Sequence, residues 1–209
     1  MHVMIKKTLS GYKVFPNTEI TSRGVFSDQF LKIGMKTFHD ACKWVNDLPY
    51  DYNSDMVDSL LIFTEKKGVC LTKHGAIAKL AEELGLPIHK YVGFFRLDDE
   101  IYTGIGKMLE RYDLDYIPQI DCFLQYEDHS VDLTDGNCTG KNKAIDEFDF
   151  IVPVPPEISM DEMIILYMQY FEKYADFEPK FNTVGMDKII TALSECIAEM
   201  QARCRIAPH

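Results

Sequence analysis

Several features that mark other classes of protein are missing from this 209-residue chain. It has no run of 18 apolar residues, and residues 1–7 lack the basic-then-apolar order of a secretory signal. We therefore expect a cytoplasmic protein with no membrane partner. Basic clusters are missing as well, since the formal charge is −11 and acidic residues are spread along the chain, and this disfavours nucleic acid as a partner.

Paired cysteine motifs are also missing. The six cysteines stand at positions 42, 70, 122, 138, 196 and 204, and their spacing matches neither a CxxC pair nor a zinc pattern. Without a secretory signal this predicts reduced thiols rather than a disulfide scaffold. Residues 103–106 contain two glycines but no third glycine and no Gly-Lys-Ser/Thr, so they do not predict a phosphate loop. No cofactor is expected.

What is present is an ordinary globular composition, with 46% apolar and 26% charged residues. The length suits one well-buried core, so we predict a single domain over residues 1–209.

The segment 65–87 is the part of the chain whose residue types and spacing suggest chemistry. Its apolar residues Ile77, Leu80, Ala81 and Leu84 recur at helical spacing. Gly85 and Pro87 form a C-terminal stop, so the pattern predicts a helix from about 70 to 84. Cys70 then lies in the first turn, where unpaired N–H groups and the helix dipole favour a thiolate. The alternative is that Cys70 is an inert buried cysteine.

A second informative stretch predicts a β-hairpin. Residues 119–126 and 130–134 are two β-prone runs separated by a polar turn. In a suitable register Asp121 and Asp132 face the same side of the hairpin, opposite or diagonal to each other. Two carboxylates on one face suggest a site, although Gln119 and Gln125 alternate with them and a solvated face remains the alternative.

The other predicted elements complete an α+β fold. We expect strands over 88–96 and around 148–152. Helices are predicted over 27–48, with an interruption near Gly34, and over 56–64, about 107–112, 159–174 and 186–205.

Three short motifs carry a resemblance to a known family. They are Leu48-Pro49-Tyr50, Gly68-Val69-Cys70-Leu71-Thr72-Lys73-His74 and Val131-Asp132-Leu133-Thr134. Together they resemble the transglutaminase-like superfamily of papain-type cysteine acyl-transferases and proteases, and within it a little-studied bacterial branch. The likeness runs from about residue 38 to 135. It implies a nucleophile helix packed on an antiparallel sheet in a core of about 38–155, with extra N- and C-terminal helices, the latter over about 159–206.

The resemblance also implies a triad of Cys, His and Asp. Cys70 matches the nucleophile and Asp132 matches the acid, but Asp121 occupies the position of the histidine. A carboxylate there raises the thiol pKa instead of withdrawing its proton. His74 follows Cys70 by one helical turn and is expected to be structural rather than the base. His129 lies at the hairpin tip, about 10 Å along the strand from the surroundings of residue 132, so it is not expected to replace the missing base.

Three functions follow from these residues. The first is a degenerate or weakly active member that binds a peptide, protein or small amide or ester substrate. The second is an active amidohydrolase, acyl-transferase or protease that works through a Cys70 thioester. The third is a divalent-metal site formed by Cys70, His74, Asp121 and Asp132, because these ligand types suit zinc.

Overall fold

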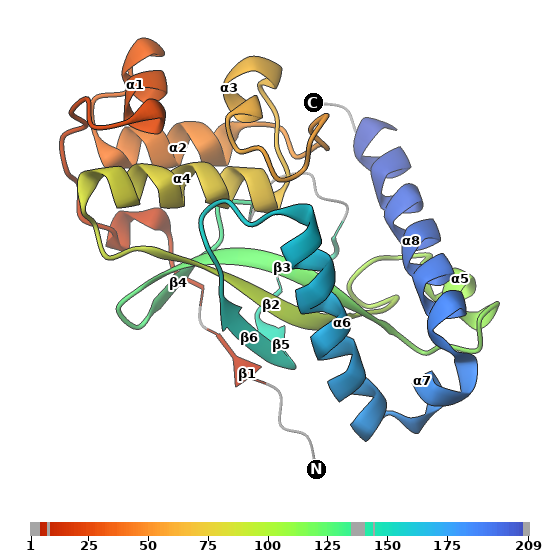
Figure 1. Cartoon of the computed structure of the whole chain (residues 1–209). Coiled ribbons are helices and arrows are strands. Elements are labelled where there is room, and N and C mark those ends of the chain that lie inside the picture. Colours follow the sequence, from red (N-terminus) through yellow and green to blue (C-terminus); the bar gives the residue numbers. More distant parts are fainter. Residues whose placement is uncertain (1–4, 8, 135–140, 144, 207–209) are drawn as a thin grey trace.

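A four-stranded antiparallel sheet forms the centre of the computed structural model, which describes residues 5–7, 9–134, 141–143 and 145–206 (Figure 1). The strand order is β4 (His129–Val131), β3 (Ile117–Tyr126), β2 (His89–Leu97) and β6 (Phe150–Pro153). A second sheet pairs β1 (Ile5–Lys6) with β5 (Glu147–Phe148). The predicted α+β class is therefore confirmed, as are the strand at 88–96 and the hairpin.

Helix α4 (Cys70–Leu84) packs on β3 and β2, and its boundaries agree with the prediction. Helices α1 (Val25–Lys32), α2 (Phe38–Asp47) and α3 (Leu61–Glu65) lie beside α4 on the side away from the sheet (Figure 1). Aromatic contacts join them, because Phe63 meets Phe30 edge-on with 4.8 Å between ring centroids and stacks on Trp44 at 5.5 Å. This layer fixes α4 against the sheet.

The interruption predicted near Gly34 is confirmed, because the helix expected over 27–48 is the two helices α1 and α2, with Gly34 at a φ of 87° between them. Another helix prediction in this layer needs correction. The helix expected over 56–64 is only the five-residue α3, which begins after a turn in which the Asp58 carboxylate accepts from the N–H of Leu60 at 2.9 Å. That carboxylate competes with helix formation in the preceding residues.

The remaining helices share the core of the sheet. They are α5 (Gly106–Glu110), α6 (Met160–Phe177), α7 (Pro179–Val184) and α8 (Met186–Ile206). Ser159 caps α6, as predicted, by accepting from the N–H of Glu162. Tyr170 of α6 stacks on Phe94 of β2 at 4.7 Å, and the buried core around these rings extends from Val69 to Met200. Helix α7, which begins at Pro179, was not predicted.

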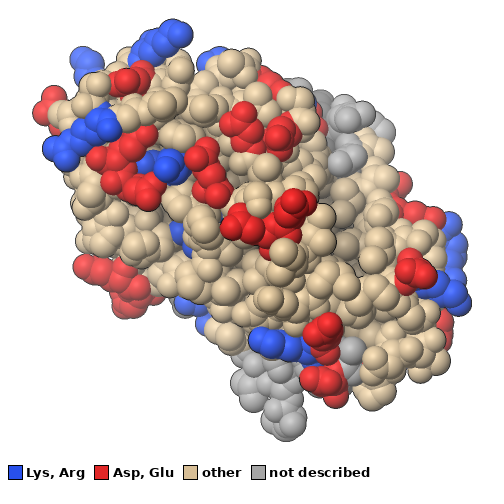
Figure 2. All heavy atoms as spheres, in the orientation of Figure 1, with Lys and Arg blue, Asp and Glu red and all other residues tan. Residues whose placement is uncertain are grey.

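The described helices include none with the length and apolar character needed to cross a bilayer. On the face shown in Figure 2, acidic side chains gather in several groups over α2, α3 and α4, with basic side chains scattered among them. That face therefore presents no basic patch.

Candidate functional site

Helix α4 begins at Cys70 because the residues around it fix its first turn. The Thr72 hydroxyl accepts from the N–H of Val69 at 3.1 Å and donates to the Asn53 side chain at 2.7 Å. A Cβ on Gly68 would stand 2.8 Å from that hydroxyl, so the close approach requires glycine. The prediction that Cys70 lies in the first turn is confirmed.

The Leu-Pro-Tyr turn lies beside this helix start. The N–H of Gly68 donates to the carbonyl of Pro49 at 3.1 Å, and Tyr50 forms a parallel bridge with Gly68. Two of the motifs that carry the family resemblance are thus in contact, although they are separated by a whole helix in the chain.

A cavity of about 140 Å³, which we call the Cys70 cleft, opens at the start of α4. Its wall is mainly apolar and aromatic, and the residues that line it are Tyr50, Tyr52, Met56, Val69, Cys70, Leu71, Phe95, Gln119, Ile120, Asp121, Lys141, Ile197 and Met200. Cys70 itself is 7% exposed. Of the four predicted site residues, Cys70 and Asp121 line this cleft, and His74 and Asp132 are absent from its lining.

The floor of the cleft is the outer edge of β3. Strand β4 pairs only with residues 124–126, so within the described residues positions 117–123 have no strand partner on that side. Side chains bond to the backbone there instead, since the Gln119 amide oxygen accepts from the N–H of Ile120 at 2.8 Å and Asp121 Oδ1 accepts from that of Cys122 at 3.0 Å. The Asp121 side chain is therefore held along the edge of its own strand.

The other carboxylate oxygen of Asp121 binds a residue that sequence analysis missed. Lys141 Nζ donates to Asp121 Oδ2 at 2.5 Å, and the Lys141 side chain is only 10% exposed. Burial lowers the pKa of Lys141, but the charges of Asp121 and Asp132 outweigh burial and raise it above its ordinary value. Lys141 is thus an ammonium group inside the cleft. A single lysine in a loop carries no sequence signal for such a role.

The Cys70 thiol is held in its protonated form. The neighbouring Cys122 thiol and burial raise its pKa well above the ordinary value, and the negative charge of Asp121 adds to them, whereas Lys141 acts in the opposite direction. This is the direction expected when a carboxylate replaces an imidazole. The helix start does not make Cys70 a ready thiolate.

His74 uses both ring nitrogens to hold α4 to the segment after β4. Nε2 accepts from the N–H of Leu133 at 2.8 Å, so Nδ1 carries the proton and donates to the carbonyl of Cys70 at 2.8 Å. The side chain is fully buried. It contacts the backbone of residue 70 rather than the thiol, which agrees with the structural role expected for it.

Asp132 lies against His74 instead of facing the cleft. Its Oδ1 is 3.3 Å from His74 Nε2 and accepts from the N–H and the hydroxyl of Thr134, both at 2.7 Å. Burial raises the pKa of Asp132, but the charge of Lys141 and the bond from Thr134 act against it and lower that pKa below its ordinary value. The predicted strand 130–134 ends at Val131, so Asp132 follows the paired residues and is not part of the ladder.

Two remaining predictions concern His129 and a metal. His129 begins β4, where its Nδ1 is 3.3 Å from the Ser10 hydroxyl, and it does not line the Cys70 cleft.

Across the described part of the chain there is no group of three or more His, Cys, Asp or Glu residues arranged to hold a metal ion. Cys70, His74, Asp121 and Asp132 therefore do not form the zinc site given as one alternative.

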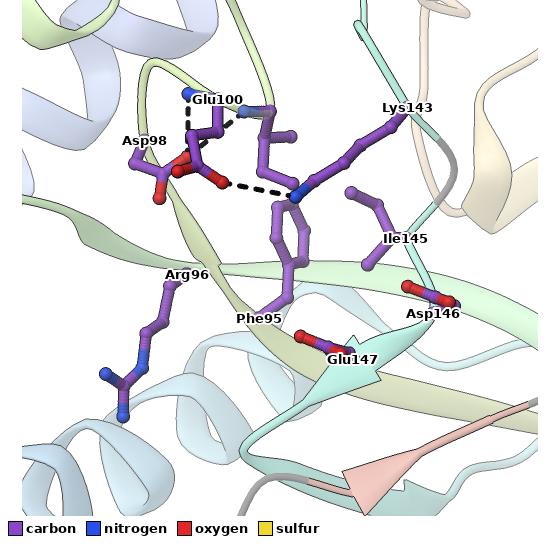
Figure 3. A pocket seen from close by; sticks show the side chains of 9 residues that line it. Phe95, Arg96, Asp98, Glu100, Lys143, Ile145, Asp146 and Glu147 are labelled. Atoms are coloured by element: carbon purple, nitrogen blue, oxygen red, sulfur yellow. Dashed lines mark hydrogen bonds and ion pairs between the residues drawn. The ribbon is translucent and has the colours of Figure 1, made fainter.

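A second cavity, of about 170 Å³, lies at the C-terminal end of β2, shares Phe95 with the Cys70 cleft and is shown in Figure 3. Charged side chains line it, but each is bound to another side chain or to the backbone. Glu100 pairs with Lys143 at 3.4 Å, and Asp98 accepts from the N–H groups of Glu100 and Ile101 at 3.0 Å each. Arg96 points away from the other charged groups in Figure 3 and binds Asp149. The described residues that line this cavity include no cysteine or histidine, so the Cys70 cleft is the better candidate.

Comparison of the chain with protein-family models, curated proteins and solved structures finds no match. The functional argument therefore depends on the geometry of the Cys70 cleft and on the sequence motifs.

Proposed function

We propose that this protein is a degenerate transglutaminase-like cysteine protein that keeps the Cys70 cleft for binding and does not turn over a substrate. One observation carries the proposal. The cleft that contains the Cys70 thiol also contains the Asp121 carboxylate, bound to Lys141, at the position where the family resemblance expects an imidazole.

Cysteine acyl transfer needs a thiolate, a group that moves protons and donors for the oxyanion. The N–H groups in the first turn of α4 can serve as the oxyanion donors. The raised pKa of Cys70 opposes formation of the thiolate. Among the described groups at the thiol there is no candidate for the group that moves protons, because Lys141 is already protonated and both nitrogens of His74 are bound to the backbone. Loss of a positioned base typically costs about 10²–10⁴ in rate.

The cleft itself supports binding. An apolar protein cavity of about 150 Å³ is large enough for benzene. The Cys70 cleft is of similar volume, about 140 Å³, and aromatic and thioether side chains from Tyr50, Tyr52 and Met200 contribute to its wall. We infer that it accepts one medium-sized apolar group of a peptide, or of a small amide or ester.

Active acyl transfer remains the second candidate, because Cys70 begins a helix inside a cleft. In that case the Cys70 sulfur attacks the carbonyl carbon and the N–H groups of the first turn bind the oxyanion. The C–N or C–O bond then breaks to leave a Cys70 thioester, and the thiol proton leaves with the amine or alcohol.

Generic amide and ester substrates separate the two candidates. We expect the unmodified protein to show no hydrolysis that depends on Cys70. Asp121→His should raise the rate of Cys70 alkylation and shift its pH profile downward, because the introduced imidazole can withdraw the thiol proton. Asp121→Asn is the matched control, and it should shift the profile downward by less than Asp121→His because it removes the negative charge without adding a base. Turnover by the unmodified protein that Cys70→Ala abolishes would refute the proposal.

A further inference from the structure

We propose that Lys141 is the cation of the Cys70 cleft and that its charge stabilises the ionised form of Cys70, as an imidazolium would. The inference deepens the proposed function and rests on it in one respect, namely that the Cys70 cleft is the functional site. It assigns a role to a residue that belongs to none of the recognised motifs.

The position of Lys141 in the cleft is well fixed. Its Nζ is 2.5 Å from Asp121 Oδ2 and 5.9 Å from the centre of the Phe95 ring. The neighbouring Asn142 anchors the backbone, because its N–H donates to the carbonyl of Ile101 at 2.8 Å and its side-chain amide donates to the carbonyl of Glu100 at 3.1 Å. The ammonium is thus held where it lines the same cavity as the Cys70 thiol.

The other titratable groups around Cys70 differ from Lys141 in charge or in access. Strand β3 contributes Asp121 and the Cys122 thiol, and the segment after α2 contributes Tyr50 and Tyr52. Strand β2 contributes Lys90, whose Nζ donates to the carbonyls of Leu71 at 3.0 Å and Pro156 at 2.9 Å. His74 binds the backbone carbonyl of Cys70 and not its thiol. Of the residues that line the cleft, Lys141 is the cation.

This arrangement separates two tasks that an imidazole combines. The Lys141 ammonium stabilises a Cys70 thiolate by charge, and Asp121 opposes it. Because the carboxylates keep Lys141 protonated, it does not take the thiol proton or relay it to a leaving group. Reactions that need only a thiolate therefore depend on Lys141, whereas reactions that need proton transfer receive no help from it. Lys141 is a positioning residue in this sense.

The test is the pH profile of Cys70 alkylation by iodoacetamide, in which the thiolate forms an S–C bond and iodide leaves. The modified Cys70 peptide is quantified by mass spectrometry, which distinguishes it from the other cysteines. Lys141→Met should move the inflection to higher pH and slow the reaction at pH 8, by about tenfold if the thiol pKa rises by one. Asp121→Asn should move the inflection downward, and Lys141→Arg should keep the original profile because the charge remains.

Opposite shifts of the alkylation inflection in Lys141→Met and Asp121→Asn cannot arise from general loosening of the fold, because loosening would expose Cys70 in both variants. Circular dichroism and thermal melting confirm that each variant is folded, and Lys141→Gln replaces Lys141→Met if the latter is not. An unchanged inflection in the folded neutral variant, or a shift in the same direction as Asp121→Asn, would overturn the inference. Turnover by the unmodified protein would instead refute the proposed function and leave the role of Lys141 intact.

Discussion

The Asp132 carboxylate illustrates how residue-scale contacts assign a role. It is nearly buried, it binds both the N–H and the hydroxyl of Thr134, and it lies against the ring of His74. His74 in turn joins α4 to Leu133. These contacts make Asp132 part of the link between the hairpin and α4, whereas the family resemblance alone would place it behind a catalytic imidazole.

Asp132→Asn should therefore reduce stability in a pH-dependent way. The folded-state pKa lies below the ordinary value of 3.8, so the ionised carboxylate contributes stability at neutral pH that is lost as the pH falls below about 4. The expected loss at pH 7 is on the order of 2 kcal/mol. Urea unfolding of both proteins at pH 7, 4 and 2 measures it. Asp176→Asn, at an exposed position of α6, is the control.

A constant difference between the unmodified protein and Asp132→Asn across this pH range would contradict the assignment, because a purely steric effect does not titrate.

The start of α4 is the element on which the site depends. Thr72 bonds to Val69 within the helix start and to Asn53 in the preceding loop, while Lys73 donates to the carbonyls of Asn46 at 3.2 Å and Leu48 at 2.8 Å at the end of α2. Two consecutive polar side chains of the Gly-x-Cys-x-x-Lys-His segment are thus buried in backbone and side-chain contacts. Their role is to fix the place at which the helix begins.

Thr72→Val keeps the shape of the side chain and removes its hydroxyl. We expect a loss of about 1–2 kcal/mol in the free energy of unfolding, since the Val69 N–H and the side-chain oxygen of Asn53 lose a buried partner. Chemical denaturation measures the loss. Thr64→Val in α3, where the hydroxyl is exposed, is the matched control and should change stability little. Equal effects of the two substitutions would argue against a special role for Thr72.

On the scale of the whole molecule, the C-terminal helices and the sheet form one core. Phe171 of α6 and Met200 of α8 belong to the same buried cluster as Cys70 and Phe94. A second cluster lies under α1, α2 and α3, and Trp44 packs at its border. Helix α4 contributes buried residues to both clusters, so it couples the two halves of the protein.

This coupling predicts a single cooperative unfolding transition. Phe171→Ala, at a site remote in sequence from Trp44, should destabilise the protein by about 3–5 kcal/mol. The unfolding midpoint measured by Trp44 fluorescence should fall as much as the midpoint measured by far-UV circular dichroism. Ile164→Ala, at a residue of α6 that is 54% exposed, is the control and should leave both midpoints nearly unchanged. Separate transitions for the two signals would show that the clusters unfold independently.

The sequence by itself determined the elements that depend on local pattern. Helical spacing and the Gly85 stop define α4 from Cys70 to Leu84, and alternating β-prone residues around a polar turn define the hairpin of β3 and β4. The same local rules fail where tertiary contacts or turn chemistry compete with propensity, as in the shortened α3 and in β4, which ends before Asp132.

Only the tertiary structure decided which groups surround the thiol. The Lys141 ammonium reaches Asp121 across 20 residues, and His74 binds Leu133 across 59. Such contacts depend on how the loops and strands fold back on α4, and no periodicity in the sequence records them. The sequence therefore identified Cys70 as the residue of interest, while the packing of the chain around it set its charge environment and with it the chemistry that Cys70 can perform.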